Sequence, residues 1–137
     1  MRVNLPVTQH ELPFPAGELL VSTTDVQGRI THANRAFVLV SGYTYDELLG
    51  QPHNMIRHPD MPPEAFKDMW ATIGRGRPWT GLVKNRCKNG DHYWVEANVT
   101  PILANGKPEA YMSVRRQPTR EQVREAERSE EHTSELQ

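Results

Sequence analysis

One segment of this 137-residue chain places a tryptophan, a glycine and an amide on a single strand face. Side chains alternate across a strand with a period of two, so Trp79, Gly81, Val83 and Asn85 share a side. An indole offers a stacking surface, glycine leaves room, and an amide offers hydrogen-bond donors and an acceptor. Because a buried amide needs partners, this face predicts a ligand with a planar ring and a polar edge. The alternative is a face that points to solvent, where an amide is unremarkable.

A hairpin signal places the next strand beside this one. The dipeptide Asn89-Gly90 lies between two alternating segments and is typical of a two-residue type I′ turn. That turn pairs Asn85 with Trp94, and Gly81 with Asn98. The predicted ligand face then includes a second aromatic ring and a second amide.

A second segment gathers charge, imidazole and proline between residues 53 and 60. Arg57 and His58 are suited to binding a phosphate or pyrophosphate. Metal binding by His53 and His58 is a weaker hypothesis, because neither their spacing nor a nearby cysteine fits a structural zinc site, and we expect no metal. The alternative is a solvated loop in which Asp60 caps the next helix and pairs with Arg57.

The sequence carries no familiar catalytic motif. It lacks the nucleophile elbow of hydrolases, a Walker-type phosphate loop and the zinc-protease motif. A lone strand cysteine such as Cys87 is more often inert than reactive. We interpret the basic residues of the strands as solvated, namely Lys84, Arg86, Arg115 and Arg116. A binding domain is therefore expected rather than an enzyme.

Composition limits the class of protein and its compartment. The 16 basic and 17 acidic residues give a formal net charge of −1, which argues against a nucleic-acid-binding surface. There is one cysteine, no apolar run of about 20 residues that would span a bilayer, and no signal peptide. These features predict a cytoplasmic segment that makes no contact with a membrane.

Turn and cap signals predict the order of the elements. Asn34 is expected to cap a short helix ended by Gly42, and Thr44 with Glu47 forms a capping box for another. A longer helix is expected to start at the Pro62-Pro63 pair. Strands are expected at residues 19–25, 29–33, 79–87, 92–102 and 110–115. This order predicts an α/β (α+β) fold, a five-stranded antiparallel sheet with short helices on one face and a pocket between the two.

The chain divides into one domain with short flanking segments. Residues 1–18 form an N-terminal cap or arm, residues 19–117 the domain, and residues 118–127 the start of a linker helix. Residues 128–137 form a polar string that looks like the translation of a sequencing-library adapter. We interpret them as a non-native tail and exclude them from the fold prediction.

Several segments resemble a sensor family. Ser-Thr-Thr-Asp at residues 22–25 and Glu-Leu-Leu-Gly at residues 47–50 resemble the opening half of a PAS domain. Gly-Gln-Pro-His-Asn-Met-Ile-Arg-His-Pro-Asp-Met-Pro at residues 50–62 resembles the PAS domains of the bacterial aerotaxis receptor family in particular. Further segments of this likeness are residues 40–44, 78–81, 83–86, 88–95 and 111–115, so the resemblance extends over residues 19–117.

This resemblance implies a PAS fold that holds FAD without a covalent bond. In the family, residues matching Arg57, His58 and Asp60 are tied to FAD binding, and Asn34, Trp79 and Asn85 are further expected contacts. His53, Phe66 and Trp94 are weaker candidates. The chain departs from the family pattern at Cys87, where a basic residue is usual.

The hypothesis that follows is a flavoprotein redox sensor for oxygen sensing, energy taxis and aerotaxis. The resemblance implies a HAMP-like and methyl-accepting-type signalling region in the same receptor, which acts on the chemotaxis kinase complex. It also implies a homodimeric full-length receptor anchored at the inner membrane. Reduction of the flavin would change the hydrogen bonds of Asn85 and shift a two-state arrangement of the domain.

Other outputs and other ligands stay open from the sequence. The first alternative is a PAS sensor that controls a histidine kinase or a diguanylate cyclase. The second is an interaction module with an empty pocket or with haem, for which His32, His53 or His58 would be the axial ligand. A flavin-dependent enzyme is a third, disfavoured by the absence of a substrate-binding domain.

Overall fold

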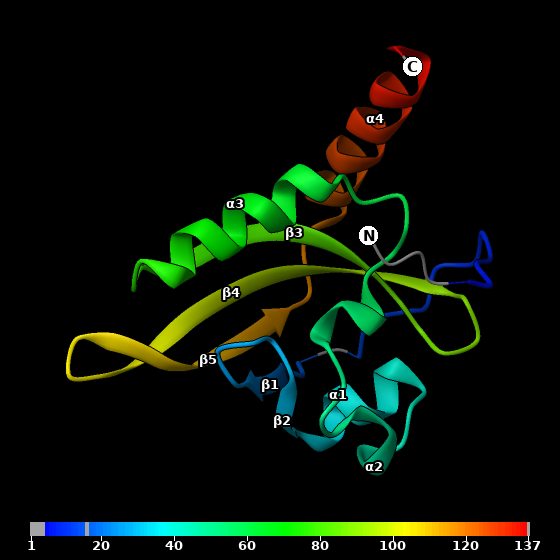
Figure 1. Cartoon of the computed structure of the whole chain (residues 1–137). Helices are drawn as coiled ribbons and strands as arrows, with labels where there is room; N and C mark the ends of the chain where they lie inside the picture. Colours follow the sequence, from blue (N-terminus) through cyan, green and yellow to red (C-terminus); the bar gives the residue numbers. More distant parts are fainter. Residues whose placement is uncertain (1–4, 16, 137) are drawn as a thin grey trace.

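Five strands form the centre of the molecule. The computed structural model describes residues 5–15 and 17–136. Within them the strands form one antiparallel sheet in the order β2-β1-β5-β4-β3, so β5 lies in the middle (Figure 1). The predicted fold class is confirmed. The strands are β1 (Leu20–Thr24), β2 (Ile30–Ala33), β3 (Trp79–Arg86), β4 (His92–Ala104) and β5 (Lys107–Arg116).

Short helices follow the second strand, and their predicted caps are confirmed. Asn34 caps the first helix by accepting from the Phe37 amide, and Gly42 ends it at φ 77°. Thr44 and Glu47 form both bonds of a capping box. The helices are α1 (Arg35–Ser41), α2 (Tyr45–Leu48), the 3₁₀ turn η1 (His53–Ile56), α3 (Pro63–Gly74) and α4 (Arg120–Leu136).

The register of the β3–β4 hairpin differs by one residue from the prediction. Asn85 pairs with Tyr93, and Gly81 pairs with Ala97. The turn holds three residues rather than two, because the Cys87 amide bonds the Asp91 carbonyl and only Gly90 has a positive φ, of 100°. A shift of one residue moves every side chain of β4 to the other face.

The two faces of the sheet therefore carry different residues. The inner face, toward η1 and α3, bears Asn85 on β3, Ala97 on β4 and Arg115 on β5. The outer face bears Lys84, Arg86 and Trp94, among others. Lys84 and Arg86 are 8% and 4% exposed, so the prediction that they are solvated is wrong.

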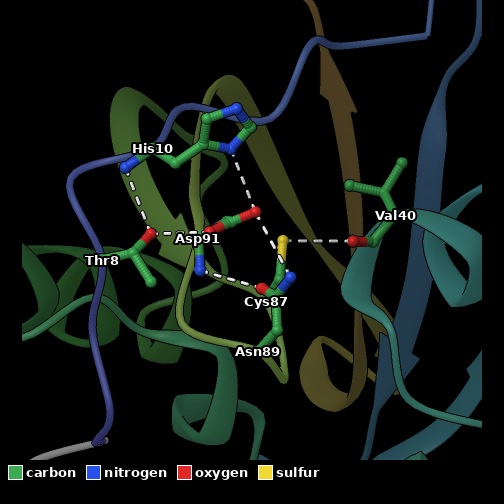
Figure 2. A network of polar contacts seen from close by, with 6 residues as sticks. All are labelled: Thr8, His10, Val40, Cys87, Asn89 and Asp91. Atoms are coloured by element: carbon green, nitrogen blue, oxygen red, sulfur yellow. Dashed lines mark hydrogen bonds and ion pairs between the residues drawn. The ribbon is translucent and has the colours of Figure 1, made fainter.

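The N-terminal arm covers the edge of the outer face. The Thr8 amide donates to the Gly90 carbonyl and the His92 amide donates to the His10 carbonyl. Thr8 Oγ1 also donates to Asp91 at 2.6 Å, and His10 Nδ1 lies 3.1 Å from the same carboxylate (Figure 2). The arm thus fastens the β3–β4 turn, and its Pro6 carbonyl accepts from Arg86 Nε, which helps to bury Arg86.

The helix α4 leaves the sheet through a capping box at Thr119 and Gln122. It points away from the sheet (Figure 1) and extends through Leu136, so it includes most of the segment that we interpreted as a non-native tail. In the described part of the chain, no helix combines the length and the apolar character that crossing a bilayer requires.

Candidate ligand-binding cavity

A cavity of about 410 Å³ lies between the inner face of the sheet, η1 and α3. This volume is within the usual range of small-molecule and cofactor sites. Aromatic, amide and basic side chains of both layers line it. Those used below are Thr24, His53, Arg57, Phe66, Lys67, Trp79, Asn85, Tyr111, Ser113 and Arg115.

The glycine of the predicted ligand face makes room for the tryptophan beside it. A Cβ atom at Gly81 would lie 2.3 Å from the ring of Trp79, so the indole covers the strand where a side chain is missing. Trp79 Nε1 donates to Asp68 of α3 at 3.0 Å. Because this bond joins β3 to α3, it fixes the ring as a wall of the cavity.

Arg57 and Asn85 meet at the edge of the sheet. Their backbones form an isolated antiparallel bridge, which brings η1 and its following residues against β3. Arg57 Cζ lies 4.7 Å from the centre of the Phe66 ring, an arrangement that holds the guanidinium over α3. All three side chains line the cavity, as do Trp79 and His53, so five of the nine candidate residues are brought together.

His53 is half-buried and lines this cavity. Its Nε2 atom lies 3.0 Å from Ser22 Oγ and accepts from Arg115 at 3.1 Å, and its ring stacks on Phe37. Burial first, and then the Arg115 charge, lowers the pKa of His53 to about 3. The imidazole is therefore neutral at pH 7, with its proton on Nδ1.

Arg115 is the cavity residue that sequence reasoning missed. We expected it to be solvated, but it is 2% exposed. Its guanidinium donates to Ser113 Oγ at 3.0 Å and to Ser22 Oγ at 2.8 Å, and it lies 4.3 Å from the centre of the Phe37 ring. Burial lowers its pKa to about 10, so it stays charged at neutral pH. The signal in the sequence was the alternation of Tyr111, Ser113 and Arg115 along one strand face.

Comparison with known proteins identifies the fold family. A profile described as PAS fold matches residues 30–115. The chain belongs to the PAS family. Among solved structures, a light-oxygen-voltage domain studied with a flavin analogue superposes with a TM-score of 0.72 at 20% identity, covering 85% of this chain and 89% of that one. A PAS domain from Colwellia psychrerythraea gives a TM-score of 0.68 at 25% identity, covering 74% and 87%.

Two curated relatives place this PAS domain more closely. The aerotaxis receptor of Escherichia coli strain K12 is 59% identical over 117 residues, which are 85% of this chain and 23% of the receptor. A nitrogen fixation regulatory protein of Klebsiella pneumoniae is 34% identical over 97 residues, 70% of this chain and 20% of that protein. The predicted resemblance to the aerotaxis receptor family is confirmed. The chain spans about a quarter or less of the length of these relatives.

Two candidate residues of the PAS domain lie behind the cavity wall. The His58 amide donates to the Lys84 carbonyl, and His58 Nδ1 accepts from the Asp60 amide at 3.1 Å. The Asp60 carboxylate lies 3.4 Å from Lys84 Nζ. Burial first, followed by the Lys84 charge, lowers the pKa of His58 to about 4. These contacts hold the segment after Arg57 against β3 and place His58 on the outer side.

The other two candidates also have structural partners. Asn34 Oδ1 accepts from the amides of Val21 and Phe37, so this residue joins β1 to α1. Trp94 lies on the outer face, with Lys84 Nζ 5.6 Å from its ring centre. Neither residue lines the cavity. The predicted pairing of Trp94 with Asn85 is wrong, for the reason of register given above.

The charges around the cavity fit a planar ring with an anionic extension. Among the described lining residues, Arg57, Lys67 and Arg115 are basic and none is acidic, although the whole chain has a net charge of −1. Two buried polar atoms there, Thr24 Oγ1 and Arg115 Nε, have no hydrogen-bond partner. Groups of three or more histidine, cysteine, aspartate or glutamate side chains able to hold a metal were not found in the part of the chain that the structure describes.

Proposed function

We propose that this PAS domain binds FAD without a covalent bond and senses the redox state of the cell for aerotaxis. The observation that carries the proposal is the basic, carboxylate-free lining of the cavity, combined with aromatic walls. FAD joins a planar ring to a pyrophosphate, so it needs both surfaces. The identity of 59% to an aerotaxis receptor supports the same ligand and the same output.

The cavity residues divide the binding work by their chemistry. Trp79 and Phe66 offer faces against which a ring can pack, and Asn85 offers both hydrogen-bond donors and an acceptor. Arg57 lies near α3 and is suited to the pyrophosphate. His53 is neutral and contributes an aromatic surface and a fixed acceptor for Arg115.

The candidates outside the cavity act on its shape. Asn34 holds the start of α1, which carries Phe37. His58 and Asp60 fasten the segment after Arg57 to Lys84, and Trp94 packs on the opposite side of the sheet. Substitution at these positions is expected to weaken FAD binding through the fold, with a loss of stability in the FAD-free chain as well.

Bound FAD would supply reversible uptake of electrons at the ring. Asn85 forms a backbone bridge with Arg57 and pairs with Tyr93 of β4, so a change in its hydrogen bonds reaches both η1 and the hairpin. We propose that this shift favours one of two domain arrangements. The output would be read by a HAMP-like and methyl-accepting-type region of a homodimeric receptor, with this domain in the cytoplasm and the receptor anchored at the inner membrane.

The first experiment is an absorption spectrum of the purified chain, followed by heat release and chromatography of the chromophore. Flavin bands and released FAD would support the proposal. A Soret band would indicate haem in place of flavin, with His53, which lines the cavity, as the imidazole to test as its ligand. A protein that stays colourless after refolding with FAD would overturn the proposal.

A matched pair of amide substitutions tests the site itself. Asn85→Ala is expected to weaken FAD binding about tenfold, because a hydrogen bond to the ring is lost. Asn98→Ala removes the same group from the outer face, where Asn98 bonds Thr80, and is expected to change binding less than twofold. Equal affinities of the two variants, measured by fluorescence titration, would exclude Asn85 as a contact.

A further inference from the structure

The guanidinium of Arg115 is a buried charge at the wall of the cavity. Among the described residues, no carboxylate lies within salt-bridge distance of it. Its hydrogen-bond partners are the two serine hydroxyls and the neutral imidazole of His53, and its Nε atom has none. The Phe37 ring offsets part of the positive charge through its π face.

Such a charge is costly unless something compensates it. A buried ion loses the hydration it had in the unfolded chain, and neutral hydroxyls return only part of that free energy. Arg115 lies on the central strand and is only 2% exposed, so solvent compensates little of this charge. The cavity lies directly beside it, and a ligand bound there could bring in a negative charge from outside the chain.

We propose that Arg115 raises the reduction potential of the bound flavin by stabilising the negative charge that the ring gains on reduction. This inference rests on the proposed function, because it needs a flavin in the cavity. It assigns Arg115 the task of setting the potential at which the sensor responds, a role that none of the nine candidate residues was given.

The charge balance of reduction supports this role. A ring that takes one electron and no proton gains one negative charge, and a ring that takes two electrons and one proton from solvent gains the same charge. The electrons come from an external donor, for which dithionite serves in the test. In both cases the product is stabilised by a nearby buried cation, since the interaction of charges is weakly screened inside a protein.

The three hydrogen-bond partners of Arg115 carry no charge and so neither cancel nor add to its positive charge. Ser22 and Ser113 hold the guanidinium in place through hydroxyl groups, which add no net charge. His53 is neutral above pH 4 because its pKa is about 3, so it adds no second cation. The charge that a reduced ring meets at this wall is therefore that of one fixed guanidinium.

The test is the midpoint potential of the FAD-loaded chain, measured by anaerobic titration with dithionite against a reference dye. Arg115→Gln is expected to lower the potential, so that the ratio of reduced to oxidised flavin falls at least tenfold at a fixed solution potential. A tenfold change equals about 59 mV for one electron. The matched control is Arg116→Gln, which removes the same charge from the next residue, where the side chain is exposed, and should leave the potential unchanged.

Two further variants separate charge from packing. Arg115→Lys keeps the charge, and its midpoint potential is expected to stay close to that of the wild type. Ser22→Asp places a carboxylate beside an intact Arg115, at a position that now accepts its bond at 2.8 Å, and should lower the potential as Arg115→Gln does. This variant keeps the test decisive when Arg115→Gln does not fold.

The outcomes also separate this inference from the proposed function. Wild-type chain that binds FAD, with the same potential in Arg115→Gln or Ser22→Asp, would overturn the role of Arg115 and leave FAD sensing intact. An equal fall in potential for Arg115→Lys and Arg115→Gln would also overturn it, because geometry rather than charge would be the cause. Wild-type chain that does not bind FAD would overturn both proposals.

Discussion

Each face of the sheet buries an arginine, and the two arginines differ in how many of their nitrogen atoms bond the chain. On the outer face, all three nitrogen atoms of Arg86 donate to protein oxygens, at Pro6, Tyr43 and Lys88. On the inner face, Arg115 keeps one nitrogen without a partner and lines a cavity. A buried guanidinium whose three nitrogen atoms all bond oxygens of the chain is part of the fold. One whose donors are incompletely satisfied beside a cavity indicates a ligand.

The largest effect that would test this contrast is on stability. Arg86→Met leaves three oxygen atoms without their donor and is expected to lower the free energy of unfolding by about 3 kcal/mol. Arg115→Met should cost less than about 1.5 kcal/mol in the FAD-free chain, since it also removes a poorly compensated buried charge. Urea unfolding of both variants measures the difference, and an equal or larger loss for Arg115→Met would contradict the contrast.

A smaller effect is expected where the inner face depends on a missing side chain. Gly81→Ala places a Cβ against the Trp79 ring, and we expect a loss of about 2 kcal/mol with a changed tryptophan fluorescence spectrum. The control is Gly74→Ala at the end of α3, where a Cβ would meet no atom within 4 Å. If Gly81→Ala were as stable as Gly74→Ala in thermal unfolding, the indole would not need the space over Gly81.

The neutral histidine of the inner face predicts a pH dependence. Its pKa is about 3 in the folded chain and near 6.5 when unfolded, so between these values the unfolded state binds the extra proton. Stability is therefore lost as pH falls from 6.5, by about 1.4 kcal/mol per pH unit from this residue. His53→Gln should flatten the curve by that slope in urea unfolding between pH 6.5 and 5. Parallel curves for the variant and the wild type would show that His53 is not held neutral.

The smallest effect is expected at an ion pair of the outer side. Arg120 of α4 binds Glu11 of the arm at 2.7 and 3.3 Å, but the Arg120 side chain is 58% exposed. Such pairs contribute little, so Glu11→Gln should cost about 0.5 kcal/mol and less at high salt. A loss above about 2 kcal/mol in urea unfolding would mean that the arm depends on this charge rather than on its backbone bonds to Gly90 and His92.

Local signals predicted the caps and failed at one turn, although the same dipeptide occurs twice. At Asn105-Gly106 both residues have positive φ, and Ala104 pairs with Lys107, as a two-residue turn requires. At Asn89-Gly90 the turn gains a residue. Distant segments meet it there, because the Lys88 amide bonds the Ser41 carbonyl and the arm bonds the Gly90 carbonyl. Hydrogen bonds to such distant residues cannot be predicted from the dipeptide alone. The extra turn residue set the register that places Trp94 on the outer face.

The burial of Arg115 also depends on distant parts of the chain and could not be predicted from its local sequence. Its strand follows a long hairpin, and the sequence order gives no sign that it lies between β1 and β4. Arg115 shares the inner face of β5 with Tyr111 and Ser113, and it is buried because η1 and α3 lie over that face. Trp79, Gly81 and Asn85 were found because a ring, a glycine and an amide on one strand face together suit a ligand. A basic residue near a strand end is common, so its type alone did not single it out.

The strand that carries Arg115 ends one residue later, and three residues connect it to α4. A protein joined to the end of α4 would therefore continue from the strand that forms the centre of the sheet. Each residue inserted into that helix would rotate the attached part by about 100° and move it by about 1.5 Å. A series of fusions that differ by single residues would thus sample orientations of an output in steps of about 100°, which makes α4 a natural junction for engineered hybrid sensors.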